Sequence, residues 1–553
     1  IIGITPVFVL ENRFDERFYP IIIWSASIAL VLLNTLSIPY LALDGDAIYE
    51  YYFANLTLTH GFWDPTFEPL KNSMLRLTIL HPIYTLVCDF NLMWEFKIVH
   101  PILFSTTAVI LYKTFSEQFP KRVSLLATFL FMFLPPFFTE LPNNTRTGMA
   151  IFFESVLILL ALDPKISNLH RSILSMITMF SIIVSHYGVA CILIFIFSVT
   201  YLFKRLVKYR INLTTSEQPS STSIVFFIVL TYTWYIYTTS SYTFYFLTEV
   251  YEQVLMSFID IFSQEMNYIT RPLESFTYNF IRIEFIMITF LSIVGVLVAL
   301  ITHPIFKNCL NFKFKRGVDT IFQELRAVNI DSTYLCFSIA ALLFLMMGLI
   351  AARFIGLDRA YMIIGILITP YTILGGFAIW KLIPFKLTSK LKKTDKLLPL
   401  TLTLLLIVNS GFVATIIHER SPQPQLDKEY ILNRGGDKEL YHFYLTYYIS
   451  EKDIESAKWL LQYRNEILKI YGSGIDKWFP SYFFYTNYDE IEPPGPYVAI
   501  KEEALERNGY FYLCEKANKL SKVIPFLEPK SVSYTHLRAH ETEADLVCRL
   551  LLE

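Results

Sequence analysis

The sequence predicts an all-α polytopic membrane protein with about eleven transmembrane helices, followed by a small α/β domain that faces outward. Three observations support this fold class. The 553-residue chain is 54% hydrophobic and only 17% charged, and its mean hydropathy is +0.44. Its apolar residues form runs long enough to cross a bilayer, and its basic residues alternate between successive loops. Such a composition excludes an ordinary soluble protein.

The predicted spans follow one another along most of the chain. They lie at 20–39, 96–112, 123–139, 147–162, 172–184, 189–203, 223–240, 284–303, 334–352, 360–380 and 397–417. About twenty Lys and Arg residues fall in alternate loops, against about seven in the others, which predicts that the basic loops are cytoplasmic. The basic loops are 113–122, 163–171, 204–222, 304–333 and 381–396. The outward segments are then 40–95, 140–146, 185–188, 242–283, 353–359 and everything after 418.

The N-terminal part of the chain divides into two predicted regions. Residues 1–18 are expected to be a truncated cytoplasmic segment, because the chain begins at Ile1 and shows no signal peptide. Residues 19–418 form the transmembrane helical domain, with a long first outward loop at 40–95. Within the outward loops, LTILHPIYTLV and the aromatic region 242–262 are too short or interrupted to span and are predicted to be interfacial or re-entrant helices.

The composition changes abruptly after the last span. Residues 419–530 are predicted to form the soluble extracytoplasmic domain, in which DIESAKWLLQYRNEILKIY has the apolar spacing of a helix. Residues 531–553 are expected to be non-native, because VSYTHLRAHET, beginning at Val532, matches the translation of a transposase sequencing adapter. The cysteines outside residues 531–553 are scattered singly along the sequence, which argues against a disulfide framework or a zinc site.

The stretch LDGDAIYEYYFANLT places three acids, Asp44, Asp46 and Glu50, where the first span emerges on the predicted outer side. Asp46 and Glu50 are four residues apart, so they share one face if the segment is helical. Two carboxylates on one face repel each other unless a cation, a proton or a substrate hydroxyl lies between them. The plainer interpretation is a helix N-cap formed by Asp44 or Asp46.

Further polar residues fall on the same predicted side, where charges at span ends often mark a pathway or a binding site. They are Arg146, then His186 and Tyr187 in SHYG, and Arg353, Asp358 and Arg359 in RFIGLDR. Each of these residues also has a simpler interpretation that involves no substrate. An Arg can extend to the lipid headgroups, His186 can satisfy backbone groups in a tight turn, and Asp358 can pair with a neighbouring Arg.

Other signatures of chemistry are missing from the sequence. It contains no GxxxxGK[ST], GxSxG, HExxH or GxGxxG motif. The basic loops lack nucleic-acid-binding motifs, so we expect anionic membrane lipid, and no nucleic acid, as their partner.

Four stretches carry a family resemblance: YLALDGDAIYEYYFANLTLTHGFWDP, KNSMLRLTILHPIYTLV, FFTELPNNTR and IIVSHYG. In the same order, they resemble the archaeal membrane proteins of domain-of-unknown-function family 2206, which have more spans upstream. The resemblance runs from about Tyr19 through DIESAKWL. Asp46 and Glu50 match acids of the family's first loop, whereas Ile48 stands where the family has His. Of the family's second-loop ARQE pattern only Arg146 remains here.

The layout of this family is similar to that of the C-class (GT-C) membrane glycosyltransferases. This resemblance implies transfer of a sugar from a polyprenyl phosphate or diphosphate carrier, at the outer membrane face, in surface glycan or glycoprotein assembly. Asp46, helped by Glu50, would orient or deprotonate the acceptor hydroxyl or hold a divalent cation, Mg²⁺ or Mn²⁺. The expected substrate-binding residues are Asp44, Arg146, His186, Tyr187, Arg353 and Arg359, of which Arg146 and His186 would neutralise the departing phosphate.

Two alternatives come from other functional classes. A transporter or flippase for a lipid-linked glycan would need polar residues within the bilayer and paired broken helices, and Glu154 is the clearest acid inside a predicted span. A non-catalytic membrane scaffold would use its outward domain to bind a surface protein. Acids that converge with Arg146 in an outward cavity would favour the enzyme.

Overall fold

The computed structural model describes residues 2–10, 15–38, 40–41, 46–211, 219–239, 245, 276–302, 330–350, 357–382, 397–417, 419, 469–472, 491–492 and 509–512. The chain forms two compact units. The first comprises Ile1–Leu33, Asp64–Leu77 and Ile98–Gln423. The second comprises Asn34–Trp63, Thr78–Lys97 and Pro424–Glu553.

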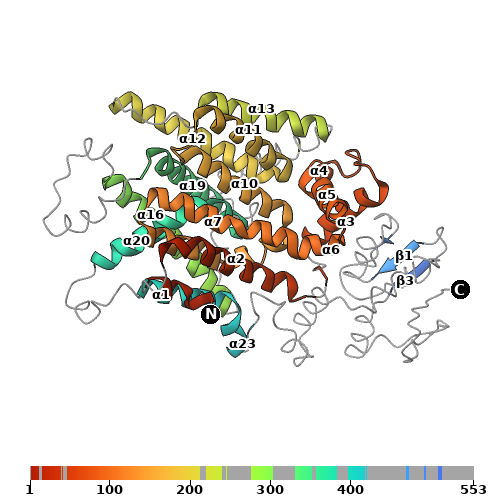
Figure 1. Cartoon of the computed structure of the whole chain (residues 1–553), viewed down its shortest axis with the longest axis horizontal. Helices are drawn as coiled ribbons and strands as arrows, with labels where there is room; N and C mark the ends of the chain where they lie inside the picture. Colours follow the sequence, from red (N-terminus) through yellow and green to blue (C-terminus); the bar gives the residue numbers. More distant parts are fainter. Residues whose placement is uncertain are drawn as a thin grey trace, which may run out of the picture. The chain divides into compact units, whose positions relative to one another are not determined.

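The first unit is a bundle of apolar helices (Figure 1). Large side chains such as Phe104, Phe129 and Phe131 are fully buried in its core. The main helices are α2 (Tyr19–Leu36), α7 (His100–Gln118), α8 (Lys121–Phe133), α9 (Pro135–Phe138), α10 (Thr145–Leu162), α11 (Asn168–Ser185), α12 (Tyr187–Ile211), α13 (Ser221–Thr238), α16 (Phe276–Thr302), α19 (Ser332–Ile350), α20 (Leu357–Leu382), α22 (Leu397–Asn409) and α23 (Phe412–Ile417). Short elements precede or connect them: η1 (Ile2–Ile4), α1 (Thr5–Leu10), η2 (Glu16–Phe18), α4 (Pro69–Asn72) and η5 (Leu141–Asn143).

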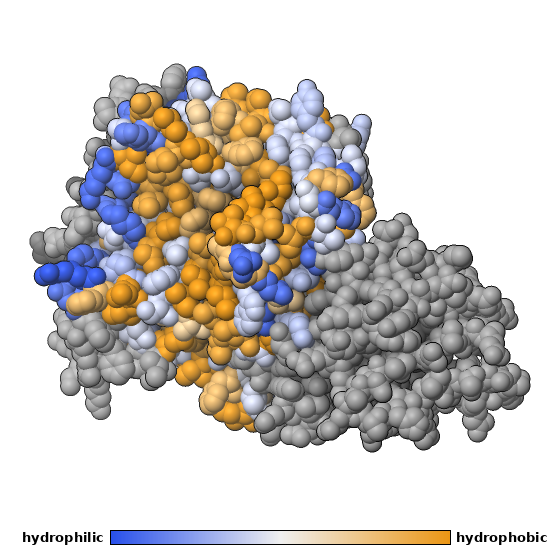
Figure 2. All heavy atoms as spheres, turned by 45° about the vertical axis from the view of Figure 1, so that its right-hand side comes forward, coloured by the Kyte–Doolittle hydropathy of each residue, from blue (hydrophilic) through white to orange (hydrophobic). Residues whose placement is uncertain are grey.

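The helices of the bundle have the length and composition of membrane spans. Within the described residues, seven helices are long and apolar enough to cross a bilayer, and α8 with α9 is an eighth candidate, bent by 69°. Apolar side chains dominate the bundle surface seen in Figure 2, and Ile177 and Phe290 are examples of large exposed hydrophobic residues. The chain is therefore a membrane protein. Each predicted span overlaps a helix, but the count of about eleven stays a prediction because α11, α19 and α22 are not among the seven.

Proline residues set the irregular points of these helices. The bend between α8 and α9 falls at Leu134, which is extended (φ −63°, ψ 134°) because the residue before a proline avoids helical backbone angles. Two five-residue π-helical segments, η3 (Arg76–Leu80) and η4 (Glu95–Val99), are each followed by a His-Pro pair. Pro82 and Pro101 lack an N–H and crowd the preceding turn, so a wider turn there relieves the clash.

Helices α16 and α20 pack with unusually close backbones. A Cβ at Gly295 would overlap the carbonyl group of Tyr371, and a Cβ at Gly375 would overlap that of Leu291. Small residues allow such close approach between helices within a membrane. The hydroxyls of Ser292 and Thr372 share a hydrogen bond of 2.7 Å across the same interface.

Loops predicted to face outward meet at one end of the bundle. Arg359 Nε lies 3.5 Å from Glu140 Oε2, which joins the end of the predicted outward segment 353–359 to the start of the segment 140–146. The indole N–H of Trp234, near the end of α13, donates to the carbonyl oxygen of Ser73 at 3.0 Å. These contacts agree with the predicted grouping of outward loops.

Loops predicted to be cytoplasmic also contact one another. Lys204 Nζ donates to Thr333 Oγ1 at 2.9 Å, and the backbone N–H of Asp331 donates to Gln118 Oε1 at 2.8 Å. Each contact joins a residue of one basic segment to a residue of another. These contacts among the described residues agree with the charge pattern, while the sorting of the other loops and which end faces the cytosol stay predictions.

The second unit contains three helices from the N-terminal part of the chain and a small sheet. Helix α3 (Asp46–His60) packs against α5 (His81–Cys88) and α6 (Leu92–Trp94). Strands β1 (Lys469–Gly472), β2 (Ile491–Glu492) and β3 (Gly509–Tyr512) form a parallel sheet in the order β2-β1-β3. Ile470 is aligned with Ile491 on one side and with Tyr510 on the other.

The sheet corrects one sequence prediction. The run DIESAKWLLQYRNEILKIY was predicted to be helical to its end, but its last three residues, Lys469–Tyr471, belong to β1. Pairing of β1 with strands on both sides outweighs the helical spacing there, because tertiary hydrogen bonding overrides local propensity. The remainder of the predicted α/β domain, and residues 531–553, lie outside the described residues apart from these strands.

Candidate functional site

The acidic stretch singled out in the sequence forms the first turns of α3. The helix begins at Asp46, and Glu50 lies one turn further along. Asp46 is half-buried, whereas Glu50 has 0% of its surface exposed. Ile48, at the position where the family pattern has His, is also fully buried. The predicted helix is thus confirmed, and its two acids differ in access to solvent.

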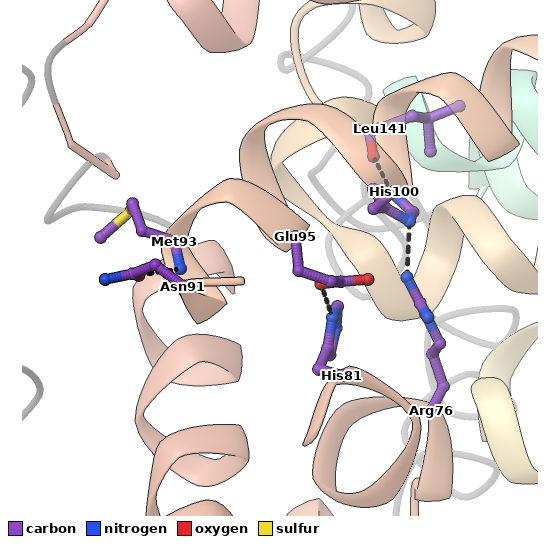
Figure 3. Close-up of polar contacts among 7 residues, drawn as sticks. All are labelled: Arg76, His81, Asn91, Met93, Glu95, His100 and Leu141. Atoms are coloured by element: carbon purple, nitrogen blue, oxygen red, sulfur yellow. Dashed lines mark hydrogen bonds and ion pairs between the residues drawn. The ribbon is translucent and has the colours of Figure 1, made fainter. Parts of the chain in front are cut away.

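A second buried acid in the same unit was not predicted from the sequence. His81 Nδ1 and Glu95 Oε2 form a hydrogen-bonded ion pair in which both side chains are 0% exposed (Figure 3). The imidazole of His81 stacks on the ring of Phe96, with 4.0 Å between ring centroids. The ring of Tyr51, in α3, packs edge-on against the same Phe96 ring, with 5.7 Å between centroids. The residue after Glu50 therefore contacts the residue after Glu95 through their aromatic rings.

The first unit has its own buried polar chain. Arg76 Nη2 and His100 Nδ1 are 2.9 Å apart, and His100 Nε2 lies 3.5 Å from the carbonyl oxygen of Leu141 (Figure 3). Because a guanidinium only donates, Nδ1 of His100 must accept, and the ring proton then lies on Nε2, facing Leu141. Arg76 is 2% exposed and His100 0%. The result is a buried cation oriented by a neutral imidazole.

One sequence signal could have identified these residues. His81 and His100 each begin a His-Pro-Ile triplet, and each triplet directly follows a π-helical segment, where functional residues are often found. Arg76 and Glu95 are the first residues of those two segments. The repeated His-Pro-Ile triplet is visible in the sequence, but its link to a π-helical segment is visible only in the structure.

The start of α10 adjoins His100. A Cβ placed on Gly148 would lie 3.1 Å from the carbonyl oxygen of Leu141 and 3.2 Å from His100 Nε2, so any larger residue would require these neighbours to shift. The Asn144 side chain caps α10 by accepting from the N–H of Thr147 at 3.3 Å. Arg146, the predicted phosphate-binding residue, is the second residue of α10 and is 6% exposed. Two guanidinium groups, of Arg76 and Arg146, are therefore buried in this unit.

His186 has a structural role in the observed geometry. Its Nδ1 accepts hydrogen bonds from the backbone N–H groups of Gly188 at 3.0 Å and Val189 at 3.3 Å, at the start of α12. The ring stacks on Tyr187 with 5.1 Å between centroids. A histidine that accepts at Nδ1 caps the helix in its neutral form. Neutralising a phosphate would require a proton on Nδ1 and would break this cap, so the geometry fits the structural interpretation.

Of the remaining predicted residues, Arg359 pairs with the residue that precedes Leu141, and the others lie wholly or partly outside the described residues. Arg359 pairs with Glu140, and their side chains are 45% and 37% exposed. This partner differs from Asp358, the neighbour considered in the sequence. Asp44 and Arg353 lie outside the described residues, as does the side chain of Asp358.

Metal binding by the acids is not tested by the structure. Among the described residues, no group of three or more His, Cys, Asp and Glu side chains is arranged to hold a metal ion. Asp46 and Glu50 alone could supply two carboxylates, and Mg²⁺ commonly takes its other ligands from water and substrate phosphate.

A comparison with protein families identifies the chain. The family described as "Predicted membrane protein (DUF2206)" matches residues 171–547. The chain belongs to this family. The matched part of this DUF2206 protein includes SHYG and RFIGLDR, whereas Asp46, Glu50 and Arg146 precede it. The match ends inside the segment 531–553, whose expected origin in an adapter stays a prediction. No curated protein matches the chain.

Proposed function

We propose that this DUF2206 protein is a membrane glycosyltransferase that uses a polyprenyl-phosphate-linked sugar at the outer membrane face, in surface glycan or glycoprotein assembly. The observation that carries the proposal is the first part of α3, where a half-buried Asp46 stands one turn before a fully buried Glu50. A carboxylate in the first turn of a helix is stabilised by the helix dipole. An ionised carboxylate that substrate can reach is what a general base or a cation ligand requires, and the half-buried Asp46 can supply it.

The proposed reaction needs one base and one site for the leaving phosphate. The acceptor hydroxyl oxygen forms a bond to the anomeric carbon of the sugar, and its proton passes to Asp46. The bond between that carbon and the phosphate oxygen breaks, and the carrier phosphate leaves with the electron pair. Glu50 would position Asp46, or both acids would hold Mg²⁺ or Mn²⁺, which would supply positive charge for the donor phosphate.

Buried arginines support the phosphate-binding part of the proposal. Arg76 and Arg146 are both almost fully buried, and the guanidinium group suits bidentate binding of phosphate oxygens. Arg76 was not predicted, and its bond to His100 fixes its orientation. Arg353, Arg359, Asp44 and Tyr187 remain proposed substrate contacts, and Arg359 would leave Glu140 to act. The acids and the arginines belong to different units, so each role is tested by itself.

The experiment uses the purified full chain and an extract of lipid-linked sugars. Mass spectrometry should show consumption of the sugar-bearing carrier and release of the free carrier phosphate. Arg76→Met should reduce the rate of carrier consumption at least about tenfold, because the variant cannot stabilise the negative charge on the departing phosphate in the transition state. Arg17→Met is the control, because the side chain of Arg17 is 88% exposed. Equal rates for wild type and Arg76→Met would remove Arg76 from the site, and no consumption by the wild type would refute the transferase.

A second function has specific support. Helix α8 is separated from α9 by a 69° break, and α22 is interrupted before α23 at Ser410 and Gly411. Interrupted helices are also a feature of transporters, which supports this alternative. A flippase for lipid-linked glycans would move labelled carrier across a vesicle membrane without altering its chemical structure. Movement without consumption would favour this alternative over the transferase.

A further inference from the structure

A buried carboxylate of α16 lies at the meeting point of three helices. Glu284 is 6% exposed, and its two carboxylate oxygens accept hydrogen bonds from Asn409 Nδ2 at 2.9 Å and 3.2 Å. The same nitrogen donates to the backbone carbonyl oxygen of Phe133 at 3.0 Å. Three oxygen atoms therefore converge on one position, and that position is occupied by the amide group of Asn409.

Two of these helices end at this point. Helix α8 ends at Phe133, and the extended Leu134 separates it from α9. Helix α22 ends at Asn409, and Gly411, in the left-handed region with φ 80°, begins the turn into α23. The last carbonyl groups of a helix carry partial negative charge. The C-termini of two helices thus meet at Asn409, whose amide contacts one acidic side chain in an apolar span, where an uncompensated carboxylate is strongly unfavourable.

One more oxygen is available at the site. Asn409 is 0% exposed, and within the described residues its Oδ1 atom accepts no hydrogen bond. Rotating the amide by half a turn would place Oδ1 where Nδ2 now stands, beside the Glu284 carboxylate and the Phe133 carbonyl. The side chain can therefore offer either a donor or an acceptor to the same position.

Other ionisable groups near Glu284 come from α16 and α20. Tyr361 of α20 donates from its hydroxyl to the carbonyl oxygen of Phe285 at 3.0 Å. Arg282 of α16 donates to Asn279 Oδ1 at 3.0 Å. In the described parts of α19 and α22, the other helices packed against α16, the sequence has no charged residue.

We propose that Glu284, Asn409 and the Phe133 carbonyl form a binding site for one small monovalent cation, a proton or a sodium ion. A single positive charge neutralises the single carboxylate. Carboxylate, amide and backbone carbonyl oxygens at the ends of interrupted helices are the ligands that membrane transporters use for Na⁺ and H⁺. A divalent ion is disfavoured because it usually takes more oxygen ligands and more negative charge than this site provides. The proposal is independent of the transferase assignment.

The test measures cation-dependent stability of the purified full chain in detergent. Because a ligand that binds only the folded protein raises the unfolding midpoint, we expect the midpoint to rise by several degrees when NaCl replaces choline chloride at constant ionic strength. A proton site would instead give a rise on acidification that is independent of sodium. Either dependence should be lost in Glu284→Gln, and this variant should keep the contact to Asn409.

Glu154→Gln is the matched control. Glu154 is a fully buried acid in the span formed by α10, and its carboxylate oxygens have no hydrogen-bond partner among the described residues. It should retain the sodium dependence found in the wild type, and in the proton arm the loss of dependence in Glu284→Gln should exceed the loss in Glu154→Gln. If Glu284→Gln fails to fold, Asn409→Ser removes Oδ1 and serves in its place. A wild-type midpoint that responds to neither cation, or a response unchanged in the Glu284 and Asn409 variants, would overturn the site.

Discussion

Arg76 and His100 form a buried hydrogen bond of 2.9 Å between Nη2 and Nδ1, although they are 24 residues apart in the chain. This bond fixes both the orientation of a buried cation and the tautomer of the imidazole. It also brings the middle of the first predicted outward loop to the start of α7, at the same end as Leu141 and the start of α10. In the proposed transferase, Arg76 would be the positively charged contact for the lipid phosphate.

Replacement of Gly148 by Ala should disturb this contact. The added Cβ would lie 3.1 Å from the Leu141 carbonyl oxygen and 3.2 Å from His100 Nε2, so the imidazole must shift. We expect sugar transfer to fall about tenfold, since small misplacements near a reacting group are costly. Gly376→Ala is the matched helical control, because its Cβ would meet nothing closer than 4.0 Å. Equal transfer rates for the two variants would show that the His100 contact is not needed.

The role of His186 can be decided by its replacements. Because its Nδ1 caps α12, His186→Asn should preserve both stability and transfer, and His186→Ala should lose about 1 kcal/mol of stability. Thermal unfolding and transfer rates measure the two effects. A loss of transfer above about tenfold in His186→Asn, with folding intact, would instead support the phosphate-binding role.

Two adjacent glycines test the packing of α16 against α20. Gly375→Ala should destabilise the protein by about 1–3 kcal/mol, because its Cβ would overlap the Leu291 carbonyl. Gly376→Ala should be neutral or stabilise by up to about 1 kcal/mol, since alanine favours the helix. Thermal midpoints of the two variants in the same detergent provide the comparison. Similar midpoints would mean that α16 and α20 can move apart without a loss of stability.

The orientation of the bundle can be measured by labelling. In a cysteine-free background, Thr66→Cys and Ser167→Cys place single thiols at exposed positions in segments predicted to lie on opposite sides. An impermeant maleimide added to intact cells should label Cys at position 66 and leave position 167 unlabelled until the cells are opened. Labelling of position 167 from outside would reverse the predicted orientation.

Much of the fold follows from local features of the sequence. Hydropathy located the helices because a span must be apolar over most of its length. Asp46 and Glu50, which share one face only if their segment is helical, do lie in one helix. Loop charges grouped segments that do contact one another, such as those containing Glu140 and Arg359.

The polar pairs could not be predicted in the same way. His81 and Glu95 are 14 residues apart, and their meeting depends on how α5 and α6 fold back on each other. The proline-associated π-helical turns change the direction of these side chains, and a periodic pattern of 3.6 residues does not include such turns. Similarly, the cap made by His186 depends on an extended backbone between α11 and α12, which SHYG alone does not specify.

The most direct test of the proposed transferase is the rate of sugar transfer from a polyprenyl phosphate donor by purified Asp46→Asn. The substitution keeps the size of the side chain but removes the charge needed to accept a proton or bind a cation. Asp89→Asn is the matched control, because Asp89 is exposed and has φ 51°, a conformation that Asn tolerates well. We predict that Asp46→Asn loses transfer by a factor on the order of 10² or more with its thermal midpoint unchanged, while Asp89→Asn stays within a few-fold of wild type. Full activity in a folded Asp46→Asn protein would contradict the proposed role of α3 as the catalytic segment.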